Sequence, residues 1–293
     1  MKESTYIDPL SDGGFKLFFG KEGKSEEFLM DFLNELFKDD PYFRNITSVQ
    51  YKNVEMSKEQ REGKEIRYDI HCTTSTGHKF IVEMQRKVYP DFINRSIYYV
   101  ARAITEQVDN EYEFLPVVGV FVTEGRIGGL KNSTILDFQF SDRVDSNEKL
   151  DKVRMVYVQL SDFNLSEEEC KTRQEKWLFI LKNLFHMDRM PFTETQDRIF
   201  RKLDHYARMT NLTAADREEY EILLKHQRDM NSAHYYSKLE GLEEGRAEGR
   251  AEGFAEGRAE VKLEIARNMK AKGLSVQDIS ESTGLTAEEI EKL

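Results

Sequence analysis

Two acidic residues, Asp69 and Glu83, lie in neighbouring segments in which apolar and polar residues alternate. Such alternation is typical of β-strands with one buried face. The two segments, 66–72 and 79–85, are joined by a short link in which Gly77 suits the left-handed position of a bulged turn. The pattern therefore predicts a β-hairpin in which Asp69 lies directly opposite Glu83.

The hydrophobic pattern also determines the register of this hairpin. Counting outward from the turn pairs apolar residues with apolar residues and the two acids with each other. A shift by one residue would turn Asp69 toward the apolar face, so other registers are disfavoured. The predicted pairs besides the acids are Thr74 with His78, Ile70 with Val82, and Tyr68 with Met84.

Two carboxylates that face each other across a sheet repel and destabilise it. One interpretation is a solvated polar face, because exposed Asp and Glu are common. The other is a divalent cation between Asp69 and Glu83, and Mg²⁺ fits because it binds one or two carboxylates together with water and phosphate oxygens. His71 shares this face but is a poorer ligand, since Mg²⁺ prefers oxygen.

Asp69 followed by Glu83-Met84-Gln85 resembles the core motif of the PD-(D/E)XK nuclease superfamily. The wider pattern resembles its recombination-promoting nuclease / putative transposase branch, and the match runs through most of the chain. The matching segments are Asp8-Pro9-Leu10-Ser11-Asp12-Gly13-Gly14-Phe15-Lys16, Glu83-Met84-Gln85-Arg86, Arg95-Ser96-Ile97-Tyr98-Tyr99 and the glycine-rich tail.

The resemblance implies an α/β fold with a restriction-endonuclease-like mixed sheet core flanked by helices, followed by an all-α C-terminal extension. It also implies a Mg²⁺-dependent DNA endonuclease of low sequence specificity that promotes DNA recombination or mobile-element activity. Mn²⁺ could substitute for Mg²⁺. Asp69 and Glu83 would be the metal ligands and, together with Gln85 and Lys16, the catalytic residues.

Gln85 departs from the superfamily pattern, in which this position is most often Lys. A glutamine amide can orient the attacking water but adds no positive charge. A nearby cation would have to supply that charge, and the sequence offers Lys16 and Lys87. Lys87 shares the face of Gln85 if the strand continues, and it is also a candidate for binding DNA. The branch that the chain resembles commonly carries Gln at this position.

Further residues of the matching segments are expected at the site. Asp12 and Lys16 look like the N-terminal site motif of the branch, although a turn acid and an exposed lysine would give the same pattern. Arg95, Tyr98 and Tyr99 are candidates for contacts with the DNA backbone. Either tyrosine could instead pack against the core.

The composition is that of a globular protein, with 293 residues and 39% hydrophobic content. No apolar run reaches the roughly 18 residues of a membrane span, and residues 1–6 contain no signal-peptide core, so the cytoplasm is expected. Cys72 and Cys170 lie far apart, which disfavours a disulfide framework or structural zinc. The net charge of −11 argues against nucleic-acid binding in general. A metal nuclease, however, needs cations mainly beside its site.

The chain divides into four predicted parts. Residues 1–165 form the nuclease-like core, 166–240 a helical extension, 241–260 a tetrapeptide-repeat helix or spacer, and 261–293 a small helix-turn-helix-like module. Within the core, we predict helices at 28–37 and 91–108 and, besides the hairpin, strands at 47–55, 117–123 and 153–160. In the extension, helix starts are predicted at Ser166, as a capping box with Glu169, and at Thr213.

Residues 241–260 repeat a pattern with a period of four, most often Gly-Arg-Ala-Glu. In a helix this places the glutamates in one row and the arginines in another, roughly 200° away. Like charges four residues apart and glycine at every fourth position weaken an isolated helix. Two copies could approach along Gly and Ala and pair acidic with basic rows, so a homo-oligomer is expected. A frayed, solvated spacer is the alternative.

Residues 261–293 resemble a helix-turn-helix, with Gly273 ending one helix, Ser275 starting the next, and Gly284 and Thr286 marking the second turn. The last helix is acidic, whereas a helix that reads the major groove is expected to carry Arg, Asn or Gln. A packing or protein-interaction module is therefore favoured over DNA reading by this segment.

Three functions compete. The first is the Mg²⁺-dependent DNA endonuclease. The second is a catalytically weak or inactive nuclease-fold protein that binds DNA or protein and self-associates; the missing Lys and the acidic charge favour it, whereas the retention of Asp69 and Glu83 argues against it. The third is a helix-turn-helix regulator, and the acidic last helix argues against this function.

Overall fold

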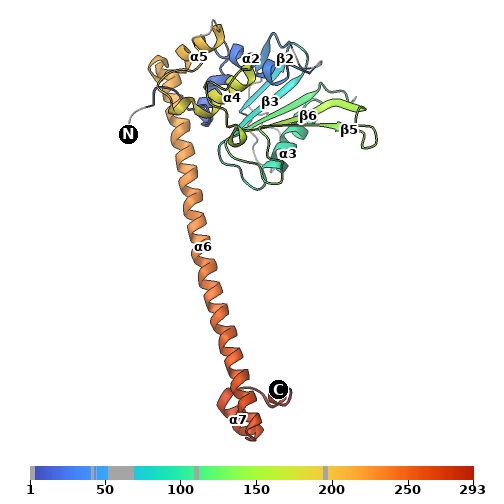
Figure 1. Ribbon diagram of the computed structural model, residues 1–293, viewed down its shortest axis with the longest axis vertical. Coiled ribbons are helices and arrows are strands. Elements are labelled where there is room, and N and C mark those ends of the chain that lie inside the picture. The colour runs from blue at the N-terminus through green and yellow to red at the C-terminus, as the bar shows by residue number, and fades with distance from the viewer. Residues whose placement is uncertain (1–3, 41–42, 44, 52–68, 109–111, 194–196) are drawn as a thin grey trace. The chain divides into compact units, whose positions relative to one another are not determined.

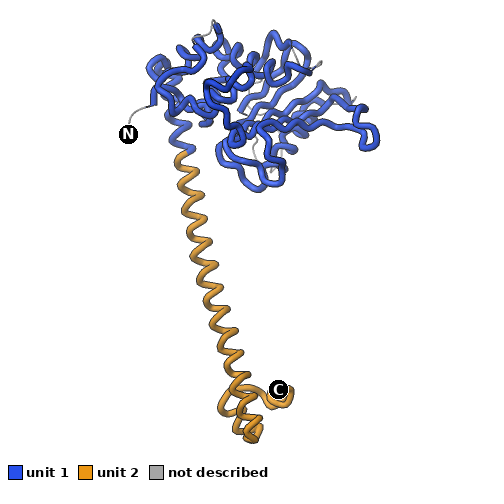
Figure 2. Tube along the Cα trace, viewed as in Figure 1, with its two compact units in different colours: residues 1–227 blue, residues 228–293 orange. Residues whose placement is uncertain are grey.

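The computed structural model describes residues 4–40, 43, 45–51, 69–108, 112–193 and 197–293. The chain forms two compact units, residues 1–227 and residues 228–293 (Figure 2). One long helix, α6 (Ala214–Ala271), begins in the first unit and ends in the second.

The first unit is built on a six-stranded sheet with the order β1-β2-β3-β4-β6-β5 (Figure 1). The three neighbouring strands β3, β4 and β6 run parallel, whereas β1, β2 and β5 pair antiparallel with their neighbours. The strands are β1 (Val49–Tyr51), β2 (Ile70–Thr74), β3 (Lys79–Gln85), β4 (Val117–Thr123), β5 (Ile135–Ser141) and β6 (Lys149–Gln159). This mixed sheet confirms the predicted fold class.

Four helices pack against one face of the sheet. Their apolar side chains form one core with inward-facing strand residues, and Trp177 is fully buried in it. The Trp177 ring is 5.8 Å from that of Phe19 and 5.4 Å from that of Phe200, so N-terminal and later helices share this core. These helices are α1 (Asp12–Phe19), α2 (Glu26–Leu36), α4 (Arg173–Asn183) and α5 (Arg198–Ala207).

The opposite face is covered by α3 (Phe92–Thr105). Phe92 and Val100 of this helix pack with Ile81 and Phe121 of the sheet in a second cluster. The central strands are therefore buried on both faces, as is usual for parallel strands. The polar face that alternation predicts for the hairpin lies under α3, so a fully solvated polar face is not what the chain forms.

Several local predictions differ from the structure. The helix start at Ser166 is wrong, because Ser166 and Glu169 close a turn in which the Ser166 amide donates to the Glu169 carboxylate. The capping box forms instead at Thr172 and Glu175, where the apolar residues of α4 follow directly. Strand β5 was not predicted. The strand predicted at 47–55 is observed as β1 (Val49–Tyr51), and residues 52–55 lie outside the described ranges. Tyr68 also lies outside them, so its predicted pairing with Met84 stays a prediction.

The second unit ends in a small three-helix module. The end of α6 packs with α7 (Val276–Thr283) and α8 (Ala287–Glu291) through buried Ala266, Ile279 and Ile290. Ser275 and Thr286 cap α7 and α8, as the sequence predicts. By contrast, every residue from 228 to 262 along α6 is exposed.

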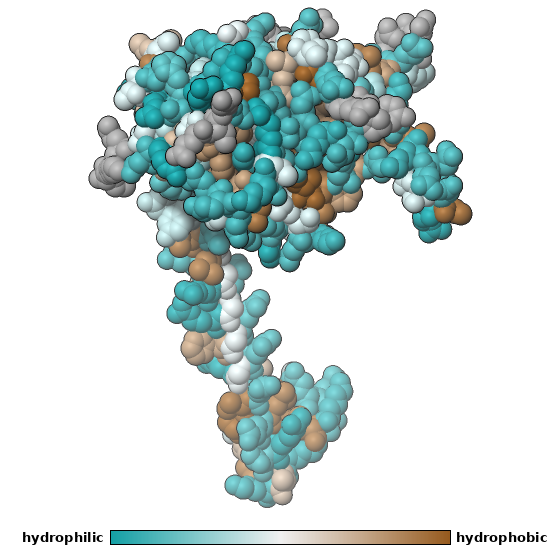
Figure 3. All heavy atoms as spheres, turned by 45° about the horizontal axis from the view of Figure 1, so that its top comes forward, coloured by the Kyte–Doolittle hydropathy of each residue, from teal (hydrophilic) through white to brown (hydrophobic). Residues whose placement is uncertain are grey.

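Hydrophilic side chains dominate the face of the molecule drawn in Figure 3, with apolar side chains in separate patches. One apolar groove of about 420 Å³ lies between α3 and the strands β5 and β6, and none of the predicted site residues lines it. Among the described helices, none combines the length and the apolar character needed to cross a membrane.

Candidate active site

The hairpin of β2 and β3 has the predicted register. Ile70 pairs with Val82, and the Thr74 amide donates to the His78 carbonyl at 2.9 Å. The turn between them uses Gly77 with a φ of 78°, a left-handed conformation that glycine adopts without steric cost. Asp69, directly before β2, therefore lies opposite Glu83.

The two carboxylates are linked through backbone amides of the opposite strand. The Asp69 amide donates to Glu83 Oε1 at 3.0 Å, and the Met84 amide donates to Asp69 Oδ2 at 2.8 Å. Within the described part of the chain, the other oxygen of each carboxylate accepts no hydrogen bond. One oxygen on each acid thus remains for a cation.

Ionising both acids at once is unfavourable in this position. Burial raises the pKa of Asp69, and the negative charge of Asp12 raises it further. Burial also raises the pKa of Glu83 well above its usual value, and the charge of Asp69 is the next cause. The positive charge of Arg95 acts in the opposite direction on both groups. A bound cation would offset this cost.

Helix α3 contributes a cation to the end of β3. Glu83 and Gln85 follow Ile81 on the strand face that α3 covers. Arg95 of α3 donates a hydrogen bond from Nη2 to Gln85 Oε1. Tyr99 lies one helical turn further along α3. Burial raises the pKa of Tyr99, and the negative charge of Glu83 is the next cause, so this tyrosine is near the acids.

Lys87 and Tyr98 have solvent-exposed positions. Strand β3 ends at Gln85, so the strand face of Gln85 does not continue to Lys87. The Lys87 ammonium is 5.6 Å from the centre of the Tyr89 ring. Tyr98 is 53% exposed on α3. Both side chains can reach a ligand outside the protein, but the structure gives neither a contact with Asp69 or Glu83.

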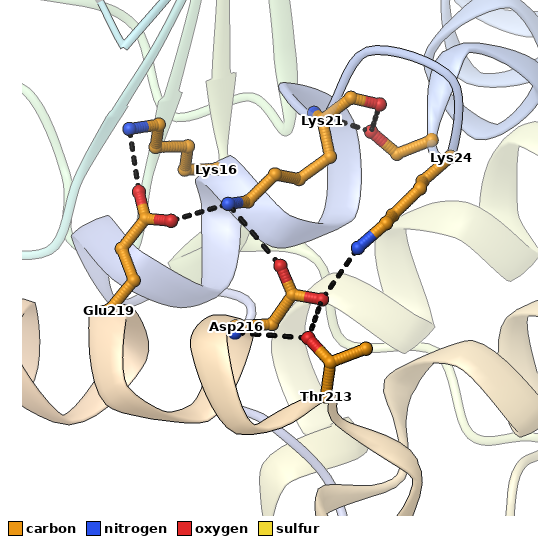
Figure 4. A network of polar contacts seen from close by, with 7 residues as sticks. Lys16, Lys21, Lys24, Thr213, Asp216 and Glu219 are labelled. Carbon is orange, nitrogen blue, oxygen red and sulfur yellow. Dashed lines mark hydrogen bonds and ion pairs between the residues drawn. The ribbon is translucent and has the colours of Figure 1, made fainter.

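Lys16 belongs to a cluster of three lysines and two acids at the start of α6 (Figure 4). Its Nζ lies 2.8 Å from Glu219 Oε1, while Lys21 contacts both Glu219 and Asp216. Lys24 Nζ lies 2.7 Å from Asp216 Oδ2. These ion pairs hold α6 against α1 and its following loop. The cation bonded to Gln85 is Arg95, whereas the ammonium of Lys16 is held by Glu219.

Asp12 is brought near the acids because a buried contact fixes α1 beside the end of β3. Asp8 accepts hydrogen bonds from the Leu10 amide at 3.0 Å and from Arg86, which directly follows Gln85. Gly14 lies against the backbone of Asp8, and only glycine fits there, since a Cβ would lie 1.8 Å from the Asp8 carbonyl oxygen. Sequence reasoning assigned no role to Asp8 or Arg86, although both stand in segments that carry the resemblance.

The ligands for a cation at this site would be few. His71 pairs with Ile81 and is 5% exposed. Among the described residues, no group of three or more His, Cys, Asp or Glu could hold a metal ion. Two carboxylates with free oxygens nevertheless fit Mg²⁺, whose remaining ligands are commonly water and phosphate oxygens. The donor set is therefore suited to a cation shared with a phosphate substrate.

A mixed sheet that carries Asp69 opposite Glu83, with Gln85 two residues further on and a helix across this face, has the architecture of a PD-(D/E)XK nuclease fold. A family model described as PD-(D/E)XK nuclease family transposase matches residues 9–237, and the chain belongs to this family. A second model, described as Rpn/YhgA-like nuclease family, C-terminal HTH domain, matches residues 259–293. No curated protein and no solved structure matches the chain. The family resemblance in the sequence is thus confirmed.

Proposed function

We propose that the protein is a Mg²⁺-dependent endonuclease that hydrolyses phosphodiester bonds of DNA with low sequence specificity. The observation that carries this proposal is the facing pair of Asp69 and Glu83, each with one oxygen free of hydrogen bonds from the described residues. Mg²⁺ or Mn²⁺ would be held by these two oxygens. When bound, the cation makes a water more acidic and neutralises charge on the phosphate.

The protein side chains would orient the reacting groups. Because Arg95 occupies Gln85 Oε1, the Gln85 amide nitrogen is available to donate to the attacking water or to a phosphate oxygen. Arg95 supplies the positive charge that Gln85 lacks, and guanidinium groups bind phosphate well. As water attacks phosphorus, the bond to the leaving oxygen breaks, and that oxygen takes up a proton.

The contacts with DNA that we propose involve the backbone. Arg95, Lys87, Tyr98 and Tyr99 are of the types that bind phosphate oxygens, and such contacts carry no direct sequence information. This supports low sequence specificity. The word transposase in the family description supports a role in DNA recombination or mobile-element activity. Asp12 and Lys16 would act at the edge of this site through their charge.

The function is tested by cleavage of supercoiled plasmid with Mg²⁺, Mn²⁺ or EDTA. Wild-type protein should nick the plasmid with either metal and fail in EDTA, whereas Asp69→Ala and Glu83→Ala should be inactive. A suitable control is Asp137→Ala, because Asp137 is an acid on the distant edge strand β5. Absence of cleavage with every metal, or cleavage that survives both substitutions, would contradict the proposal.

The alternative is a nuclease-fold protein that binds DNA without cleaving it. The observation in its favour is that Gln85 stands where most of the superfamily has Lys, and that its side-chain oxygen Oε1 already accepts a hydrogen bond from Arg95. The plasmid assay separates the two functions when a gel-shift assay accompanies it, because the alternative predicts binding with no nicked product.

We also propose that residues 241–260 of α6 join two copies of the chain. These residues are all exposed, and Leu242 and Phe254 leave 49% and 72% of their surface uncovered. No atom lies within 4 Å of a Cβ built at the repeat glycines, so a second helix has room to approach. The double substitution Leu242→Glu/Phe254→Glu should lower the mass measured by light scattering. Met230→Glu, outside the repeat, should not; equal masses for all three proteins would contradict the pairing.

A further inference from the structure

The loop between β4 and β5, residues 124–134, begins beside the candidate active site. Because β3 and β4 are parallel, their carboxyl ends lie at the same edge of the sheet. The Glu124 amide donates to the Gln85 carbonyl at 3.2 Å, and the Glu124 carboxylate lies 3.2 Å from Arg86 Nε. The first residue of the loop therefore contacts the end of the strand that carries Glu83.

Buried side chains hold this loop in one conformation. Gln159, 1% exposed at the end of β6, accepts a hydrogen bond from the Ile127 amide at 2.8 Å. Its amide nitrogen donates to the carbonyls of Lys131 at 3.1 Å and Ser133 at 2.9 Å. A buried polar side chain that satisfies three loop groups fixes the loop backbone. The loop is therefore preorganised.

The loop carries two exposed cations, Arg126 and Lys131. Arg126 donates from Nε to Asp162 Oδ1 at 2.6 Å, yet 58% of its side chain remains exposed. Asp162 therefore orients the guanidinium without covering it. Lys131 is exposed as well, and the acid at the start of the loop, Glu124, is paired with Arg86.

An exposed glycine lies between these cations. Nothing lies within 4 Å of a Cβ built at Gly128, so packing does not require a glycine there. A residue without a side chain does, however, allow another backbone to approach closely. A loop with fixed conformation, two exposed cations and an open glycine is suited to a phosphate backbone.

We infer that residues 124–134 form a second contact for DNA, in which Arg126 and Lys131 bind backbone phosphates next to the cleavage site. This inference rests on the proposed function in taking DNA as the ligand. The loop would increase the affinity for DNA and position the DNA strand, and it would take no part in the reaction at phosphorus. Among the described residues, the Arg126 side chain contacts Asp162 and the Lys131 carbonyl contacts Gln159, and neither residue is bonded to Asp69, Glu83 or Gln85.

The test is the salt dependence of DNA binding by the full chain. Fluorescence anisotropy would follow a fluorescein-labelled duplex of arbitrary sequence in EDTA over a series of NaCl concentrations. Arg126→Gln and Lys131→Gln should each weaken binding and lower the slope of log K against log salt by about 0.9, the value for one lost phosphate contact. Lys149→Gln is the matched control, because Lys149 is an exposed lysine at the opposite end of β6.

Two results would overturn the inference. One is a slope and affinity for both loop variants equal to those of wild type. The other is an equal loss in Lys149→Gln, since a general charge effect would then explain the change.

The glycine provides an independent check. Gly128→Val should leave the melting temperature unchanged, because the added side chain meets open space, and should weaken DNA binding by hindering the backbone approach. Unchanged binding by this variant would contradict the close approach at Gly128.

The outcomes also separate this inference from the proposed nuclease activity. If no metal supports plasmid cleavage but the slopes fall as expected, the loop binds DNA and the enzymatic proposal fails. If cleavage requires Asp69 and Glu83 but the loop variants bind DNA like wild type, the enzyme stands and the loop contact is wrong.

Discussion

Arg95 on α3 donates a hydrogen bond from Nη2 to the side-chain oxygen of Gln85 at the end of β3. Gln85 stands at the position where most of the superfamily has lysine. The contact brings a positive charge to this position from a different element, α3. It places a positively charged guanidinium near Glu83. The candidate site therefore contains two acids, an amide and a cation without the usual lysine.

Substituting Arg95 tests whether this cation takes part in cleavage. Arg95→Met should lower the cleavage rate at saturating Mg²⁺ by about 100-fold, the usual effect of removing one group that stabilises transition-state charge. Arg95→Lys should recover part of the rate, since it restores the charge but not the planar geometry. Single-turnover kinetics on a labelled duplex would measure both. A rate for Arg95→Met equal to wild type would exclude a role for this charge in the reaction.

Removing one acid should stabilise the metal-free protein at high pH. The raised pKa of Glu83 means that the folded state binds more protons than the unfolded state, so folding stability falls as pH rises above about 4.3, the ordinary glutamate pKa. Glu83→Gln has no such charge, so its stability advantage over wild type in EDTA should be larger at pH 8 than at pH 5. Urea denaturation at pH 5 and pH 8 would measure it. An advantage that does not grow with pH would refute this account of the pair.

The ion pairs between α1, its following loop and α6 should lose their contribution in acid. Burial alone raises the pKa of Asp216, but hydrogen bonds from Lys24, Thr213 and Lys21 outweigh it and lower the pKa below its ordinary value. Bonds from Lys16 and Lys21 likewise outweigh burial and lower the pKa of Glu219.

For acids whose pKa is lowered on folding, the stabilisation is present above the unfolded pKa of about 4 and is lost as pH falls through the folded value. Asp216→Asn/Glu219→Gln should therefore be less stable than wild type at pH 7 by about 1 kcal/mol, because the lysines are partly exposed. The difference should disappear near pH 2. Chemical denaturation at the two pH values tests this, and a constant difference would show that charge is not its cause.

Gly14 should be intolerant of any side chain. A Cβ at this position would lie 1.8 Å from the Asp8 carbonyl oxygen, a contact that requires the backbone to move. Gly14→Ala should destabilise the protein by about 3 kcal/mol, at the upper end for overpacking. Gly125→Ala is a matched control, because its nearest neighbour would be 3.8 Å away. Thermal unfolding of both variants gives the comparison, and similar melting temperatures would disprove the close approach at Gly14.

Sequence reasoning predicted the elements whose pattern is local. The hairpin register followed from the alternation of apolar and polar residues on either side of Gly77, which pairs Ile70 with Val82. The caps at Ser275 and Thr286 followed from short motifs. Strand β5 was missed because it is an edge strand whose residues are mostly exposed, although the alternation of Phe138 and Phe140 with polar residues could have identified it.

The contacts that complete the site could not be derived in this way. Gln85 meets Arg95 only because α3 packs across the sheet, and Lys16 meets Glu219 across 203 residues of sequence. Such pairs depend on tertiary packing. The sequence alone does not distinguish them from the many other polar pairs that the chain could form. The sequence could therefore predict Asp69 and Glu83 as a pair but not which cation accompanies them.

Binding of a divalent cation by Asp69 and Glu83 can be measured directly. Electron paramagnetic resonance of free Mn²⁺, titrated with the full-length protein at pH 8, reports binding without requiring cleavage. Wild-type protein should bind Mn²⁺ saturably, and Mg²⁺ should displace it. Asp69→Asn/Glu83→Gln should lose this binding while circular dichroism shows that the fold is retained. Mn²⁺ binding of equal affinity in the double variant would contradict the proposed metal site.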